Sequence, residues 1–503
     1  MTHNSSSIYL VFDIGKTNKK ALYYSPSLDL LEKRSCQIDI IYENNLEIED
    51  IEKIQSWLED EILVASQHHT IDGIALSCHG ATFALLDKND QLSYPVLSYS
   101  SEVGKENNDS FYETYGSPKE LQLSTSSPDL GFVNLGKQIH YIKTNARQAW
   151  DASLSFLFFS QYLGFLLTNE KSMEVSYLGN HSFMWDFQKS EYSQFTKDSG
   201  LIDKISLHIR KPYETLGNVK PELKSKLNIS YEIPVTVGIH DSNASILPYL
   251  ANEKDDFTLL STGTWCVGLK PNQQYELSDG DLQTKTFYNL DANGKPLRTS
   301  ISPIGYEYEE YSKLVQVKDP NQIVETSKIS QLDLVIIPGI LESTSIFADS
   351  QPGVYTKGEW FPFQQIKNNP EILKSINAEE LYLALNISLA IQTTEQLNRL
   401  NTDQKESVYI EGGFINNQTY LSCLKSLNPN LVFKQSNLQE ATAYGAAITI
   451  TMAKKLPTHK ELQELIQYES NEIKFENLPS LEEYSKHYFN ILGDQNATTT
   501  RSN

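Results

Sequence analysis

The chain has 503 residues, 39% of them hydrophobic and 21% charged, which is a globular composition with enough length for two domains of roughly 100–250 residues each. Its formal net charge of -22 argues against nucleic acid or an anionic membrane as a partner, because both bind clustered Lys and Arg side chains. Any phosphate that the protein binds is therefore expected to be small and metal-chelated.

The amino terminus, residues 1–7, is polar and leads into a strand pattern rather than into the apolar core of a signal peptide. We therefore expect a cytoplasmic protein. The most apolar window, residues 154–167, is too short to span a bilayer and is predicted to be a buried core helix. The cysteines lie far apart without CxxC spacing, which favours free thiols over disulfides or a zinc site: Cys36, Cys78, Cys266 and Cys423.

The stretch VFDIGKTNKK, residues 11–20, contains the Gly-Lys-Thr that ends a Walker A phosphate loop. That loop also needs a glycine five residues before Gly15, where this chain has Leu10, and it must open into a helix. Residues 18–24 instead have a strand pattern. The segment is predicted as strand, turn and strand, with turn amides that could hold an anion in a nest of N–H groups. An ordinary hairpin without a ligand is the alternative.

The rest of the first half continues with strands and helices, and the second half begins again in the same order, which indicates a duplicated architecture. In the first half we expect strands at 8–14, 20–25, 34–40, 71–78 and 83–86, a helix at 46–67 and mainly helical structure at 131–167. In the second half we expect strands at 235–239, 257–269 (with a turn at 261–264) and 408–411, helices at 378–400 and 440–452, and a frayed polar tail at 493–503.

Six motifs follow one another between residues 13 and 447: DIGKTNKK, SCHGATFALLD, GIHDSNAS, STGTW, EGGFINN and EATAYGAA. Together, in this order, they resemble the FGGY family of carbohydrate kinases. The resemblance implies an α/β fold of the actin-like ATPase (ribonuclease H-like) type, with two related domains and a central interdomain cleft. It places the sugar side in residues 1–243, the ATP side in residues 244–492 and a polar tail in residues 493–503.

The resemblance also implies a nucleotide site made of three loops. The first phosphate loop corresponds to Asp13, Gly15, Lys16, Thr17 and Asn18; the second to Ser261, Thr262, Gly263 and Thr264; and the adenosine motif to Gly412, Gly413, Phe414 and Asn417. Asp13 is expected to hold the Mg²⁺ of MgATP through water, which suits the strong hydration of that ion. Lys16 stands where the family usually has Thr, and it either adds a cation to the phosphates or points to solvent.

Asp241 falls where the family keeps its catalytic base, which must accept the proton of the attacking sugar hydroxyl. The alternative is that Asp241 only caps the following helix. The substrate site is expected to consist of His79, Gly80, Tyr99, His240 and Asp241, with Ser100, Glu174, His181 and Trp185 as further candidates. Trp265 is expected to be either a site residue or core packing. An arginine that many members have near residue 99 is missing, so the substrate does not transfer from the xylulose, glycerol or gluconate kinases.

The function implied by the resemblance is transfer of the γ-phosphate of ATP, with Mg²⁺, to a sugar hydroxyl. The motifs HDSNAS and GTW resemble those of the rhamnulose and fuculose kinases of the family. This resemblance implies that the substrate is a ketose or deoxyketose such as L-rhamnulose or L-fuculose. The expected partners are this small sugar and ATP, without nucleic acid or membrane, and a homodimer is possible. A non-catalytic sugar or nucleotide sensor on the same fold is the alternative.

Overall fold

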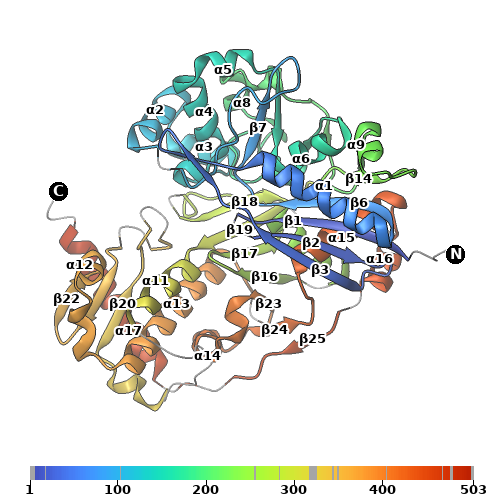
Figure 1. Cartoon of the computed structure of the whole chain (residues 1–503). Helices are drawn as coiled ribbons and strands as arrows, with labels where there is room; N and C mark the ends of the chain where they lie inside the picture. The colour runs from blue at the N-terminus through green and yellow to red at the C-terminus, as the bar shows by residue number, and fades with distance from the viewer. Residues whose placement is uncertain are drawn as a thin grey trace.

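Two seven-stranded sheets, each flanked by helices, organise the chain (Figure 1). The computed structural model describes residues 6–16, 18–101, 103–253, 256–272, 274–282, 284–315, 326–341, 345–347, 350–403, 405–466, 468–475, 478 and 480–499. Thr17, which was expected to bind nucleotide, lies outside these residues. All four cysteines are free thiols, as predicted.

The first sheet has the strand order β13-β14-β6-β1-β2-β3, with β15 also paired to β6. Strands β1 and β2 form the predicted antiparallel hairpin, in which the Gly15 amide donates to the Asn18 carbonyl at 3.0 Å. A strand therefore follows the Gly-Lys-Thr segment where a Walker loop would need a helix. The strands are β1 (Ser7–Ile14), β2 (Asn18–Tyr24), β3 (Leu30–Gln37), β6 (Thr70–Cys78), β13 (Thr215–Asn218), β14 (Pro234–Thr236) and β15 (Ile239–His240).

Helix α1 covers part of this sheet but begins later than predicted. It spans Ile51–His68 and starts at Asp50, whose side chain accepts the Lys53 amide. The residues before it form the hairpin β4 (Ile41–Glu43) and β5 (Leu46–Ile48) instead of its first turn. The prediction of one helix from residue 46 was therefore wrong at its start, because an N-cap aspartate ends the preceding extended segment.

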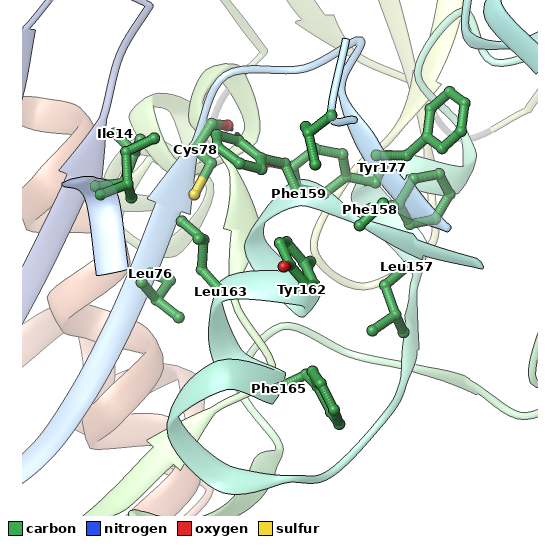
Figure 2. Close-up of a cluster of buried hydrophobic side chains, with 14 of the residues drawn as sticks. Ile14, Leu76, Cys78, Leu157, Phe158, Phe159, Tyr162, Leu163, Phe165 and Tyr177 are labelled. Carbon is green, nitrogen blue, oxygen red and sulfur yellow. Dashed lines mark hydrogen bonds between the residues drawn. The ribbon is translucent and has the colours of Figure 1, made fainter. Parts of the chain in front are cut away.

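The apolar window at residues 154–167 is largely buried as predicted, except for Leu154, which is 58% exposed, but it is not one helix. Its first part is strand β8 (Ser155–Phe158), paired with β7 (Phe83–Leu86), and helix α6 (Phe159–Thr168) follows. Aromatic residues favour such a strand when a partner strand is available. Figure 2 shows side chains of β8 and α6 packed together beside Leu76 and Cys78 of β6.

Smaller elements complete the first half, most of them forming a helical layer above the sheet in Figure 1. They are α2 (Lys105–Tyr115), α3 (Pro118–Thr125), η1 (Gly131–Val133), α4 (Leu135–Asn145), α5 (Arg147–Ala152), β9 (Met173–Glu174), α7 (Val175–Leu178), β10 (Trp185–Asp186), β11 (Glu191–Tyr192), α8 (Gln194–Asp198), η2 (Leu201–Lys204), β12 (Ile209–Arg210) and α9 (Pro221–Lys226).

The second sheet has the order β18-β19-β17-β16-β23-β24-β25. Its central hairpin, β16 and β17, is the predicted strand, turn and strand around STGTW, so both halves carry such a hairpin at the sheet centre. The strands are β16 (Phe257–Thr262), β17 (Cys266–Pro271), β18 (Thr286–Leu290), β19 (Pro296–Ser302), β23 (Ser407–Gly412), β24 (Val432–Ser436) and β25 (Ser470–Glu472).

A three-stranded sheet and several helices surround this second sheet. They are β20 (Leu334–Ile337), β21 (Gly353–Thr356), β22 (Glu359–Pro362), α11 (Ile304–Val315), η3 (Thr326–Gln331), α12 (Phe363–Asn368), η4 (Pro370–Ser375), α13 (Ala378–Arg399), η5 (Gly413–Asn416), α14 (Gln418–Leu427), α16 (His459–Leu465) and α17 (Leu481–Thr499). The expectation of a frayed tail from residue 493 was wrong as far as Thr499, because α17 continues to that residue.

Helices α10 (Asp241–Asn252) and α15 (Ala441–Lys454) lie where the two halves meet, and each also contacts β6. The small residues of α15 permit the close approach that the sequence predicted: a Cβ at Gly445 would lie 1.8 Å from the Ala244 carbonyl oxygen. Among the described residues, no helix has the length and hydropathy of a membrane span.

Candidate active site

A cavity of about 320 Å³ opens between the two halves at the start of α10. All five residues predicted for the substrate site line it, together with Trp265 and His181. The full lining is His79, Gly80, Ala81, Tyr99, Leu130, Val133, Asn180, His181, His240, Asp241, Ser242, Thr264, Trp265, Val267, Phe287, Asn289, Thr299 and Ile301.

Asp241 is the first residue of α10 and does not act as its N-cap. The cap is His240, whose Nδ1 accepts the Ser242 amide at 3.2 Å. Asp241 Oδ1 accepts from the Ser242 amide at 2.6 Å and from its hydroxyl at 3.3 Å. Burial raises the pKa of the Asp241 carboxyl, although the neighbouring His79 acts to lower it. A carboxylate that binds its proton more tightly than usual is a stronger base.

His240 is held rigidly beside Asp241. Burial, and then the charge of His79, lower the pKa of His240 to about 3, so the imidazole is neutral at physiological pH. Its Nε2 is hydrogen-bonded to the Asn180 side-chain amide. Gly80 lies against the same ring, since a Cβ there would come within 2.3 Å of His240 Nε2. Gly80 therefore makes room for the histidine that caps α10.

The cavity also receives polar atoms from both halves. His79 directly follows β6, and its Nδ1 lies 3.1 Å from the Gly80 carbonyl oxygen. Among the described residues, His79 Nε2, His181 Nδ1 and Asn289 Oδ1 are buried without a hydrogen-bond partner. A ligand with several hydroxyl groups can satisfy such atoms, and buried polar atoms left unpaired are costly.

The other sequence candidates lie outside this lining. Glu174 caps the short helix α7, where its carboxylate accepts from the Ser176 and Tyr177 amides. Trp185 stacks edge-on against Tyr192. Ser100 donates its hydroxyl to Glu47. These three side chains serve local structure.

Sequence reasoning missed Asn180, Asn289 and the apolar wall of Phe287 and Ile301. Asn289 lies on β18 and Asn180 directly follows the short helix α7, and neither belongs to a motif with recognisable spacing. The pairing of β18 with β19 is what brings Asn289 and Ile301 to the cavity.

The loop predicted to be the second phosphate loop joins β16 to β17, and the Gly263 amide donates a hydrogen bond to the Trp265 carbonyl within it at 2.9 Å. Thr264 of this loop reaches the cavity. The first turn of α11 packs directly on the loop: a Cβ at Gly305 would lie 1.9 Å from the Gly263 carbonyl oxygen. The Tyr306 amide donates to the Thr264 carbonyl at 3.0 Å.

The adenosine motif is joined to this loop through parallel pairing of β16 and β23, which sets Ser261 opposite Glu411 and Thr262 opposite Gly412. The Phe414 amide donates to Thr262 Oγ1 at 3.2 Å. The Phe414 ring is buried against Tyr420, and Asn417 caps α14. Gly413 has open space where a Cβ would be. The two glycines thus form an open turn held beside the phosphate loop.

Asp13 is the last residue but one of β1 and lies opposite Lys20 of β2. The Lys20 Nζ lies 3.3 Å from Asp13 Oδ2 and 2.8 Å from Glu440 Oε2. Burial, opposed by Lys20, raises the pKa of Asp13 to about 6, and the charge of Asp241 also raises it. Two carboxylates that repel each other's ionisation favour a bound cation. No cluster of three or more His, Cys, Asp or Glu that could hold a metal occurs among the described residues.

The Lys16 side chain lies beside Glu47 and Tyr99. Its Nζ lies 3.6 Å from Glu47 Oε2 and 4.9 Å from the centre of the Tyr99 ring. Its side chain is 30% exposed. The lysine therefore extends towards the wall of the cavity.

The fold is shared with solved structures. A carbohydrate kinase from Novosphingobium aromaticivorans superposes with a TM-score of 0.76 at 20% identity, over 97% of this chain and 99% of that one. A gluconate kinase from Lactobacillus acidophilus gives 0.80 at 14% identity, over 99% and 100%. The predicted two-domain α/β fold of the sugar kinases and actin-like ATPases is thereby confirmed.

The family is given by the sequence itself. The N-terminal domain model of the FGGY family of carbohydrate kinases matches residues 8–248, and the carbohydrate kinase FGGY C-terminal domain model matches residues 254–459. The chain belongs to the FGGY family of carbohydrate kinases.

Curated relatives are distant. The L-fuculokinase of Escherichia coli (strain K12) is 25% identical over 286 residues, which are 54% of this chain and 58% of that protein. The rhamnulokinase of Oceanobacillus iheyensis is 24% identical over 266 residues, 51% of this chain and 55% of that protein. The chain thus spans little more than half the length of the curated relatives it matches.

Proposed function

We propose that the protein is an ATP-dependent carbohydrate kinase with Asp241 as its general base. The observation that carries this proposal is the position of one carboxylate, that of Asp241, whose side chain is 35% exposed. It lies at a helix start, in a cavity walled on one side by sugar-side residues and on the other by Thr264 of the predicted second phosphate loop. Family membership supports the same reaction.

In this proposal the sugar hydroxyl lies against Asp241. Among the described residues both hydrogen bonds to Asp241 end on Oδ1, so Oδ2 is available to accept the hydroxyl proton. The oxygen then attacks the γ-phosphorus as the bond to the β-phosphate oxygen breaks, and ADP leaves. His240, whose pKa is lowered to about 3, is too weak a base to compete with Asp241 for this proton.

The nucleotide is proposed to lie across the three predicted loops, mainly on residues 244–492, with the sugar on residues 1–243. Amides of the turns after β1 and β16 would face the phosphates, and the open turn at Gly412 and Gly413 would face the adenosine. Asp13 is the residue proposed to hold Mg²⁺, through water. When bound, that ion neutralises charge on the phosphate oxygens.

For the sugar we propose a ketose or deoxyketose of the size of L-rhamnulose or L-fuculose. The polar atoms of His79, His181 and Asn289 suit hydroxyl groups, while Val133, Phe287 and Ile301 offer apolar surface that suits a methyl group. The names of the two relatives above agree with this class.

The test is ADP release with a panel of ketoses, deoxyketoses and polyols, run on the wild type and on Asp241→Asn. We expect at least one ketose to stimulate ADP release. The Asn variant keeps shape but cannot accept the proton, so kcat is expected to fall about 10²-fold or more with little change in either KM. Wild-type kcat in the variant would remove Asp241 from this role. Sugar binding without ADP release would favour a sensor.

A further inference from the structure

Lys16 connects the first phosphate loop to the wall of the sugar cavity. Its carbonyl oxygen accepts from Nζ of Lys19, a side chain buried to 1% exposure, at 2.6 Å. That bond fixes the backbone of the loop. The Lys16 side chain then leaves the loop towards Glu47 and lies over the Tyr99 ring.

Glu47 belongs to the same assembly as Tyr99. The Glu47 backbone exchanges hydrogen bonds with the Ser101 hydroxyl at 2.9 and 3.0 Å, and its carbonyl accepts the Ser98 amide at 2.9 Å. Its carboxylate accepts the Ser100 hydroxyl. The segment on either side of Tyr99 is therefore tied to β5, and Lys16 meets both the carboxylate and the ring.

Tyr99 in turn faces the sugar. It lines the cavity, and its ring lies edge-on to His79, with 5.6 Å between the ring centres. His79 Nε2 makes no hydrogen bond among the described residues, and it lies 3.9 Å from Glu49 Oε1. A change in the tilt of Tyr99 would therefore alter both the width of the cavity and the position of the histidine.

We propose that Lys16 is a positioning residue for the sugar: through its contacts with Glu47 and the Tyr99 ring it holds the aromatic wall of the cavity in place. This rests on the proposed kinase function and deepens it. Lys16 replaces the small residue usual at this position, so the first phosphate loop of this chain takes part in sugar selection through a side chain.

Geometry separates this role from the two simpler ones. A solvated lysine would not lie within reach of both a carboxylate and an aromatic face. A phosphate ligand would need its ammonium on the nucleotide side, where Lys20 already lies beside Asp13. The cation over the ring provides attraction that Met or Thr cannot supply, whereas Arg can.

The experiment is a double-mutant cycle of Lys16→Met and Tyr99→Leu, with KM for L-rhamnulose and for ATP measured separately. Lys16→Met is expected to raise the sugar KM about fivefold, in line with a loss of one cation–π contact, and to leave the ATP KM within about twofold. In the Tyr99→Leu background the same change is expected to have no further effect on the sugar KM. Lys16→Arg is expected to keep the wild-type value. Exposed Lys88, as Lys88→Met, controls for the loss of one positive charge.

A raised ATP KM with an unchanged sugar KM would overturn the proposal in favour of a phosphate ligand, and no change in either would overturn it in favour of a solvated side chain. If the wild type shows no turnover, the Kd for the sugar is measured for the same variants instead, using the fluorescence of Trp265 in the cavity. Binding with the expected pattern then overturns only the kinase function. Absence of both turnover and binding overturns both.

Discussion

Replacement of Asp13 by Asn is expected to stabilise the ligand-free protein at neutral pH. The pKa of this carboxyl is raised from 3.8 to about 6 by burial, against the opposing charge of Lys20. The folded state therefore holds its proton more tightly than the unfolded state, and stability falls as the pH rises from about 4 to about 6. At about 1.4 kcal/mol for each pKa unit, the ionised carboxylate costs about 3 kcal/mol above pH 6.

Asn has the same shape and carries no charge, and Lys20 keeps its partner Glu440 at 2.8 Å. We expect the melting temperature of Asp13→Asn at pH 7.5 to exceed that of the wild type by roughly 3–6 °C, and the gain to be about half as large at pH 5. MgADP should stabilise the wild type by about 2.7 kcal/mol at a hundredfold excess over Kd, and should stabilise the variant much less, because the proposed metal-binding carboxylate is gone.

Asp72→Asn, on strand β6, is a control of opposite sign. Burial acts to raise the pKa of Asp72, but hydrogen bonds from Lys454 and Ser7 lower it overall, so this carboxylate stabilises the fold. Its removal is expected to lower the melting temperature slightly at pH 7.5. If Asp13→Asn melts at or below the wild-type temperature at that pH, the argument from burial is wrong. If MgADP stabilises the variant fully, Asp13 does not hold the metal.

Two further predictions concern glycines at close contacts. Gly80→Ala places a Cβ 2.3 Å from His240 Nε2, so we expect a loss of about 1–3 kcal/mol in unfolding experiments and a lower kcat, since His240 must move away beside Asp241. Gly493→Ala lies inside helix α17, where a Cβ meets nothing within 4 Å, so it should leave kcat unchanged and stabilise the fold by up to about 1 kcal/mol; it serves as the control for adding a methyl group. Gly305→Ala places a Cβ 1.9 Å from the Gly263 carbonyl oxygen, so the KM for ATP is expected to rise about tenfold while the KM for sugar stays constant. Equal rises in both constants would contradict the assignment of this loop to phosphate.

The parts of the site that were predictable lie at the ends of short, strongly patterned strands. Buried apolar runs before Gly15 and before Gly263 identify strands, and the small polar residues after them identify turns at a sheet edge. The same logic placed His79 at the end of β6 and Asp241 after β15, and the structure brings both to one cavity. The local pattern located these residues at strand ends, and the resemblance to the FGGY family marked them as site residues.

The remaining parts depend on contacts between distant segments. Asn289 reaches the cavity only because β18 pairs with β19, and the apolar residues of β8 form a strand only because β7 lies beside them. An isolated apolar run fits a buried strand or a buried helix equally well. Lys16 shows the same limit for a side chain, because no pattern in the sequence indicates that Glu47 and Tyr99 lie beside it.

The position of Asp241 is set by packing more than by loops. Helix α10 contacts β6 and β15 of the first half, β16 and β17 of the second half, and α15 between them. At Gly445 the α15 backbone meets the Ala244 carbonyl one turn after Asp241, with no room for a Cβ. The carboxylate is therefore fixed relative to both walls of the cavity by an interface of small side chains. This explains why a stretch as plain as EATAYGAA accompanies the catalytic motifs: it lets the helix that carries the proposed base lie against both sheets.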